Sequence, residues 1–203
     1  KELATSNPDQ LKKALGQAGL RLWFHANGID ESNVHKPYKA KSKGLGNSQI
    51  LPRDYVKLRD IEIIIREMAE QVAIRLRRSG KKTTLVSIYV GFSKQEVRSS
   101  IHTQIKIEPT NNTAVLTDYV LKLFHNKYTS GAVRSVGVNY SGFVDESFGL
   151  ISLFDDIDKL EKEERLQTAI DSIREQFGFT SLLRANALEE ASRSLARSKL
   201  IGG

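Results

Sequence analysis

The sequence predicts an α+β domain in which a four-stranded antiparallel sheet carries two helices on one face, in the order β-α-β-β-α-β. Three observations predict it. Residues 83–108 read as two alternating strands that share one turn. Helical apolar stripes precede and follow this hairpin, and a further alternating segment closes the unit. A chain of 203 residues is long enough to bury such a core.

The central hairpin has one apolar face and one polar face. Apolar residues recur at every second position, as expected for half-buried strands: Val86, Ile88, Val90, Phe92, Ile101, Ile105 and Ile107. The opposite face carries hydroxyl, amide and basic groups, and its first acidic side chain is Glu108. Such a face suits a phosphate backbone, although a sheet face that simply meets water has the same pattern.

The elements before the hairpin are a strand and a long helix. We expect a short strand over residues 44–51 that ends at Pro52. A helix then runs from about Asp54, a candidate cap, to about Arg78 and stops at Gly80. Its apolar stripe is made by Leu58, Ile61, Ile65, Met68, Val72 and Leu76.

A second helix and a last strand complete the unit. The helix is expected over residues 113–128 with six inward residues: Val115, Leu116, Tyr119, Val120, Leu123 and Phe124. The strand is expected over residues 133–143, with Val136, Val138 and Tyr140 on one face. This order would leave the polar faces of the strands together on the side without helices.

The chain divides into four predicted regions. Residues 1–30 begin with a helix signal at Ser6, Asn7 and Pro8 and resemble the edge of a neighbouring domain. Residues 31–43 form a basic, extended linker, which could track phosphates or serve only as a solvated connection. Residues 44–144 form the compact unit. Residues 145–203 hold a short apolar peptide and two helices, the second over residues 185–200, whose acidic side chains we expect in solvent.

Charge is distributed unevenly along the chain. The net charge is +7, yet residues 145–203 hold 12 acidic and 8 basic side chains, so residues 1–144 hold the remaining 23 basic and 12 acidic ones. A basic body favours an anionic partner, and no segment is apolar enough to span a membrane. Cysteine is absent and no signal peptide is recognisable, so a cytoplasmic location is expected. The sequence opens without Met, and we expect it to be part of a longer protein.

Catalytic constellations are scarce. The four histidines, at positions 25, 35, 102 and 125, fall in different predicted elements without metal-ligand spacing. Asp155, Asp156 and Asp158 follow an apolar peptide and make at best a weak metal cluster. We therefore expect no active site in this chain.

Two other functions share the predicted topology. RNA-recognition modules stack bases on aromatic residues of their two central strands. Here the corresponding segment, residues 99–106, has no aromatic side chain besides His102, so backbone contact with a duplex fits better than base readout. A ferredoxin-like protein-interaction domain without affinity for nucleic acid is the remaining alternative.

Three short motifs resemble one family. They are KSKGLGNSQILPRD (residues 41–54), VRSS (97–100) and RSVGV (134–138). In this order and spacing they resemble the little-finger domain of Y-family translesion DNA polymerases, in the branch of UmuC-like and ImpB/MucB/SamB repair proteins. The resemblance covers nearly the whole chain, with residues 11–30 similar to the end of the thumb domain.

The resemblance implies a domain that grips the backbones of primer-template or damaged DNA during error-prone bypass, within the SOS response to DNA damage. Carried onto this sequence, the DNA-binding residues would come from three segments. They are Lys41, Ser42, Lys43, Asn47 and Ser48 at the first strand, Arg98, Ser99, Ser100 and His102 in the hairpin, and Arg134, Ser135 and Asn139 in the last strand.

The family resemblance also implies a second partner and a cofactor. Family members dock on the replication sliding clamp through a peptide that resembles Gln-Leu-Ser/Asp-Leu-Phe. The matching segment is Leu150, Ile151, Ser152, Leu153 and Phe154, in which Leu150 replaces the expected Gln. The apolar peptide could instead pack on the sheet or on a tail helix. Catalytic carboxylates and Mg²⁺ belong to the family's palm domain, which nothing in this chain resembles, so we expect a non-catalytic part of a metal-dependent polymerase.

Overall fold

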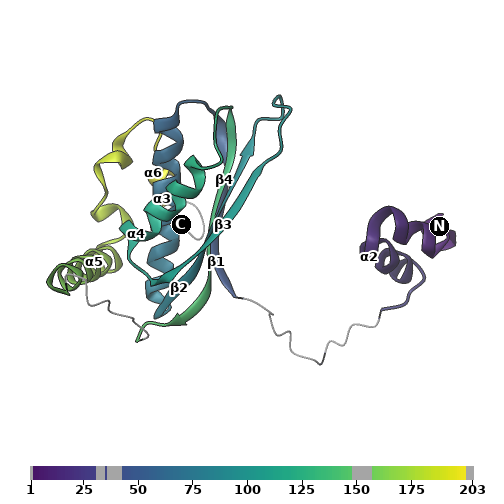
Figure 1. Cartoon of the computed structure of the whole chain (residues 1–203), viewed down its shortest axis with the longest axis horizontal. Coiled ribbons are helices and arrows are strands. Elements are labelled where there is room, and N and C mark those ends of the chain that lie inside the picture. Colours follow the sequence, from purple (N-terminus) through teal and green to yellow (C-terminus); the bar gives the residue numbers. More distant parts are fainter. Residues whose placement is uncertain (1, 31–34, 36–42, 148–156, 200–203) are drawn as a thin grey trace. The chain divides into compact units, whose positions relative to one another are not determined.

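The computed structural model describes residues 2–30, 35, 43–147 and 157–199 (Figure 1). Its contacts divide the chain into two compact units, Lys1–Lys41 and Ser42–Gly203. Each unit is described by itself.

The first unit consists of helices α1 (Glu2–Thr5) and α2 (Pro8–Ala26). The expected helix signal is confirmed: the Asn7 side chain accepts a hydrogen bond of 2.8 Å from the Asp9 amide, and Pro8 occupies the first turn. At Gly16 the backbone has φ +63° and the helix bends sharply. After this bend the chain folds back so closely that a side chain at Gly19 would collide with the Leu11 carbonyl.

The second unit is built on a four-stranded antiparallel sheet. Its strands are β1 (Gly44–Tyr55), β2 (Lys81–Phe92), β3 (Ile101–Thr110) and β4 (Val133–Asp145), in the spatial order β1-β4-β2-β3. Helices α3 (Leu58–Arg78) and α4 (Thr113–His125) both lie on one face of this sheet (Figure 1). The predicted α+β fold with its β-α-β-β-α-β order is thereby confirmed.

The core lies between the sheet and the two helices. The expected apolar faces are confirmed, because Val86, Val90, Val136 and Tyr140 are fully buried against α3 and α4. The second strand of the hairpin, β3, contributes Ile101, Ile105 and Ile107, which are partly buried and pack against the same core. Each fully buried aliphatic or aromatic side chain contributes about 1.5–3 kcal/mol, so this layer stabilises the unit substantially.

Several element boundaries differ from the sequence prediction. Strand β1 continues past Pro52 to Tyr55, since its pairing with β4 is irregular between Ile50 and Tyr55 and an edge strand tolerates a residue without an N–H. Helix α3 begins at Leu58 without a side-chain cap, so the predicted capping by Asp54 is wrong. Helix α4, by contrast, has a side-chain cap: the Asn112 side chain accepts hydrogen bonds from two backbone amides of its first turn.

Four predictions about the helices were also wrong, the first being that Leu58, which is 45% exposed, belongs to the apolar stripe of α3. Helix α4 ends at His125, and Val115, predicted to face inward, is 39% exposed. Instead of the helix predicted over residues 185–200, the described residues there form one 3₁₀ turn, Ala185–Leu188, and one short α-helix, Ser194–Arg197.

The C-terminal region packs on the side of α3 away from the sheet (Figure 1). It consists of α5 (Ile157–Phe177), the 3₁₀ turns η1 (Phe179–Ser181) and η2 (Ala185–Leu188), and α6 (Ser194–Arg197). We call residues 157–199 the tail. Helix α3 is therefore buried on two sides. The sheet covers its apolar stripe, and the tail covers Glu67 and Glu70 on the opposite side.

Acidic side chains of the tail were expected in solvent, but two of them, Asp171 and Glu163, are partly buried against the rest of the unit. Asp171 of α5 pairs with Arg77 of α3, while Glu163 accepts a hydrogen bond from the Asn112 amide group. No helix in the described parts of the chain combines the length and the apolar character needed to cross a membrane.

Candidate nucleic-acid interface

The side of the sheet opposite α3 and α4 is the candidate interface, and we call it the open face. The strand register places outward-facing residues in rows that cross all four strands. One row runs Ser48, Gly137, Tyr89 and His102, and the next runs Gly46, Asn139, Ser87 and Gln104. None of the residues in these two described rows is acidic, as the polar pattern of the hairpin predicted.

Glycines hollow the middle of the open face. Gly46 and Gly137 come from neighbouring strands, and Tyr89 rises beside them, 41% exposed. The result is a shallow hollow of about 390 Å³ that both rows border. A rigid strand backbone can approach a ligand here more closely than side chains would allow.

Asn139 and Ser87 form a fixed polar pair at the centre of the hollow. The Ser87 hydroxyl donates to the Asn139 carbonyl at 3.2 Å, and the Asn139 amide group lies 3.5 Å from the Ser87 hydroxyl oxygen. The oxygen of the same amide lies beside Gly44 and Gly46, where it would collide with any added side chain. This arrangement orients one amide toward the β1 side of the hollow.

Other polar groups on the open face have no protein partner. Among the residues that the structure describes, Ser48, Tyr89, His102 and Ser135 make no side-chain hydrogen bond to the protein. Lys106 on β3 and Lys43 before β1 are exposed in the same way. Free hydroxyl, amide and ammonium groups can donate hydrogen bonds to phosphate oxygens.

The hairpin loop holds Arg98 away from the open face. Its guanidinium lies 5.1 Å from the centre of the Phe92 ring, donates to the Ser130 carbonyl and pairs with Glu96 at 3.2 Å. Ser99 and Ser100 are exposed in this loop without such ties. Arg98 thus stabilises the loop in this structure, and its predicted contact with DNA stays a prediction.

The remaining predicted DNA-binding residues lie on β1, β3 and β4, and they do not all face the same side of the sheet. Ser48 and Ser135 face outward, but Asn47 faces the helices and donates to Gln71 of α3 at 3.0 Å, since neighbouring residues of a strand point to opposite faces. Arg134 lies 3.6 Å from Asp54, which engages part of its charge. Asn139 and His102 lie on the open face with Ser48, so the structure brings these three together.

Some predicted residues fall outside the description. Lys41 and Ser42, and the clamp-like peptide Leu150, Ile151, Ser152, Leu153 and Phe154, lie outside the described residues, as do Asp155 and Asp156. Their predicted roles stay predictions.

Sequence reasoning missed part of this interface. Tyr89, Gln104 and Lys106 belong to the polar face of the hairpin, but the sequence motifs gave them no individual role, and the hollow made by the glycines was not foreseen. Alternation along a strand reveals which face a residue takes. It carries no information on which glycines of separate strands become neighbours.

The described parts of the chain hold no group of three or more His, Asp or Glu side chains that could bind a metal ion. His125 pairs with Glu62 at 3.2 Å and His102 stands alone on the open face. These residues therefore do not fit a Mg²⁺ site, and no catalytic step is assigned to them.

The fold and this face define the chain as an α+β domain with one open, polar sheet surface. Residues 42–153 match the family model described as "impB/mucB/samB family C-terminal domain", which is more than half of the chain. The chain belongs to the impB/mucB/samB family, as the sequence motifs suggested.

Individual relatives agree with this family. The chain is 35% identical over 203 residues to the "Putative UV-damage repair protein UvrX" of Bacillus subtilis (strain 168), with 100% of this chain and 48% of the relative covered. It is 32% identical over 203 residues to "DNA polymerase IV 2" of Halalkalibacterium halodurans, covering 100% and 49%. It is 37% identical to the "DNA repair protein homolog YobH" of Bacillus subtilis (strain 168) over 131 residues, or 64% and 60%. The chain spans about half the length of the first two relatives.

Proposed function

We propose that this chain is the DNA-gripping little-finger part of a translesion DNA polymerase and holds primer-template DNA across the open face of its sheet. The observation that carries the proposal is the composition of that face. Hydroxyls, amides and glycines line the hollow around Asn139, and the rows that cross it contain no carboxylate.

Contact with the backbone suits this face better than base readout. Small side chains and glycines let phosphates approach the sheet, and their short donors reach phosphate oxygens but not the base edges deep in a groove. A grip of this kind is independent of sequence, as an enzyme that copies damaged templates requires.

The RNA-binding alternative loses support from the strand order. Base stacking requires aromatic residues on two central strands, but β3, which carries His102, lies at the edge of the sheet. Tyr89 on central strand β2 is the aromatic side chain in the two central rows described above. One ring beside an edge histidine makes a small platform for stacked bases.

The polymerase activity is a proposal about a longer protein. The names of two relatives refer to DNA polymerase IV and to UV-damage repair, and this chain spans about half the length of each. We infer that the palm carboxylates and Mg²⁺ lie outside this chain, that the protein acts in the cytoplasm within the SOS response, and that Leu150–Phe154 docks on the sliding clamp. These inferences are supported by the family membership and by the peptide sequence alone.

Salt-dependent binding tests the grip. We would titrate the chain into fluorescently labelled primer-template DNA and follow anisotropy over a series of salt concentrations. Lys43→Ala and Lys106→Ala should each reduce the slope of log affinity against log salt by about one phosphate contact. Lys122→Ala removes the same charge from the helix side of the unit and serves as the matched control.

Single-stranded RNA as a competitor separates the alternatives. Duplex binding that RNA does not displace supports the DNA grip. Displacement by RNA at lower concentrations than by duplex DNA would favour the RNA-binding module instead. If no nucleic acid binds at low salt, the open face is a solvated surface and the proposal fails.

A further inference from the structure

A second hollow lies around the edge of the sheet from the open face. It has a volume of about 290 Å³ and is formed by β1, the C-terminal half of α3 and the tail. We call it the β1-edge pocket, and its lining residues are Asn47, Gln71, Ile74, Arg75, Arg78, Arg174 and Phe179. The four α3 residues are spaced i, i+3, i+4 and i+7, so they form one stripe along the helix.

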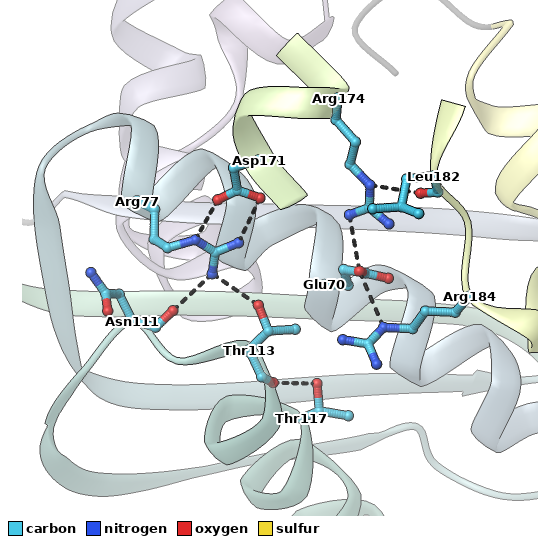
Figure 2. Close-up of polar contacts among 9 residues, drawn as sticks. All are labelled: Glu70, Arg77, Asn111, Thr113, Thr117, Asp171, Arg174, Leu182 and Arg184. Atoms are coloured by element: carbon cyan, nitrogen blue, oxygen red, sulfur yellow. Dashed lines mark hydrogen bonds and ion pairs between the residues drawn. The ribbon is translucent and has the colours of Figure 1, made fainter. Parts of the chain in front are cut away.

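The carboxylates next to this pocket are already engaged. Glu70 accepts from Arg174 at 3.0 Å and from Arg184 at 3.2 Å, as Figure 2 shows. Asp171 binds Arg77 through two bonds of 2.6 and 3.1 Å (Figure 2). Glu70 thus neutralises Arg174, and neither carboxylate pairs with Arg75 or Arg78.

Two arginines of the pocket have no acidic partner. Arg75 donates to the Gly46 carbonyl of β1. Arg78 makes no hydrogen bond or ion pair with any residue that the structure describes. Arg75 and Arg78 lie in the last turn of α3 and Arg174 in the last turn of α5, positions that favour cations, so the C-terminal ends of two helices bring three arginines to one hollow.

The pocket is preorganised by buried contacts. The Arg174 side chain is 4% exposed, donates to the Leu182 carbonyl at 2.9 Å and lies over the Phe179 ring at 4.9 Å. Asn47 donates to Gln71 at 3.0 Å, which fixes both amides and leaves the amide N–H groups of Gln71 without a partner among the described residues. The pocket wall made by Arg174, Phe179, Asn47 and Gln71 is therefore fixed before a ligand binds, and the planar guanidinium groups of Arg75 and Arg78 beside it match phosphate oxygens.

The pocket is close to the open face. Asn47 borders both hollows, because β1 is an edge strand with one hollow on each side of it. A nucleic-acid strand that leaves a duplex on the open face can pass around this edge. The volume of about 290 Å³ admits one phosphate with its sugar but no base pair.

We propose that the β1-edge pocket binds a backbone phosphate of the template single strand that continues beyond the duplex. Arg78 and Arg75 supply the charge, and Gln71 supplies a neutral donor. The proposal rests on the proposed function, since the duplex on the open face brings the single strand to this edge.

Two labelled DNA probes test it. One is a blunt duplex, and the other is the same duplex with a single-stranded template extension of about ten nucleotides. For the unaltered chain, the extension should raise affinity and steepen the salt dependence. Arg78→Ala should remove roughly three- to tenfold of the affinity for the extended probe, as expected for one lost phosphate contact, and leave the blunt duplex unchanged.

Two further variants control for charge and for geometry. Arg66→Ala removes an exposed arginine of α3 that does not line the pocket, and it should bind both probes as the unaltered chain does. Arg78→Lys keeps the charge without the planar fork and should recover part of the loss. The Arg78 side chain makes no hydrogen bond or ion pair with the residues that the structure describes, so its replacement should lower the melting temperature only slightly, by the small contribution of a cation in the last helical turn.

The outcomes separate the two proposals. If Arg78→Ala binds the extended probe as tightly as the unaltered chain while both bind the blunt duplex, the pocket proposal is overturned and the DNA grip stands. If the unaltered chain binds a single-stranded oligonucleotide in an Arg78-dependent way but no duplex, the pocket stands and the proposed grip fails. If Arg66→Ala and Arg78→Ala lose the same affinity for the extended probe, the effect comes from net charge alone and the pocket proposal is overturned.

Discussion

The guanidinium of Arg197 donates to the carboxylate of Glu67 at 2.6 Å, and these side chains are 5% and 3% exposed. Glu67 lies on α3 and Arg197 on α6, so the bond joins the tail to the central helix. The same carboxylate accepts from the Ser192 hydroxyl and, at 3.0 Å, from the Arg193 amide. Burial lowers the pKa of Arg197, and the adjacent Glu67 opposes this by favouring the charged form. The tail is thus part of the folded unit.

We predict that Glu67→Ala lowers the free energy of unfolding by about 3–5 kcal/mol, because Arg197 would remain buried without its counter-charge. Equilibrium urea unfolding followed by circular dichroism measures the change. Glu190→Ala is the control, since its pair with Arg53 is exposed and should contribute about 0–1 kcal/mol. Equal effects of the two variants would mean that the tail does not pack on α3 in solution.

Gly137→Ala should weaken DNA binding without destabilising the fold. A methyl group there would lie 3.4 Å from the Ser48 Cβ and 3.5 Å from the Tyr89 Cβ, which is ordinary contact, yet it would fill the hollow of the open face. We expect stability to change by less than about 1 kcal/mol. Anisotropy with primer-template DNA, beside thermal unfolding, tests both parts, and undiminished affinity would place the duplex elsewhere.

We expect Asn47→Ala to reduce stability and Ser48→Ala to reduce DNA affinity, because the two side chains lie on opposite faces of β1. Asn47→Ala loses the 3.0 Å bond to Gln71 and should cost about 0.5–1.5 kcal/mol of stability while blunt-duplex affinity is kept. Ser48→Ala removes a hydroxyl of the open face and should reduce duplex affinity while stability is kept. Measuring both quantities for both variants gives the comparison. The reverse assignment would mean that the register of β1 differs in solution.

Stability should fall in alkaline solution because of Tyr140. Its hydroxyl is buried and donates to the Ala69 carbonyl at 3.1 Å, and burial raises its pKa well above the usual 10.0. The folded-state pKa is raised, so the contribution of this neutral phenol is fully present below pH 10 and is lost as pH rises above that value. Tyr140→Phe should flatten the decline of unfolding free energy between about pH 10 and 11.5. An unchanged slope in the variant would assign the decline to other groups.

Much of the fold follows from local patterns in the sequence. The period-two alternation of residues 83–108 determined which hairpin residues are buried, and the 3.6-residue stripe of α3 determined its sheet-facing side. Boundaries were less predictable. Pro52 was expected to end a strand, but whether a proline disrupts pairing depends on whether its strand lies at an edge, which the local sequence does not contain.

The C-terminal region shows the same limit. Residues 185–200 contain enough Ala, Leu and Arg to suggest a helix, yet the chain forms short turns that bring Arg184 and Arg197 to Glu70 and Glu67. The energy of a buried ion pair depends on partners distant in sequence, here 130 residues apart for Arg197 and Glu67. Tertiary contacts therefore override local helix propensity.

By itself the sequence determined the order of elements, the apolar and polar faces of each strand, the basic character of residues 1–144 and the motifs of the family. These properties depend on spacing within one segment, which the covalent chain fixes. The tertiary structure alone decided that β4 and β2 are central, that Gly46 and Gly137 form one hollow, that Asn47 faces α3, and that tail arginines surround Glu67 and Glu70. Those relationships join residues far apart in the chain, and only the packing of the whole unit brings them together.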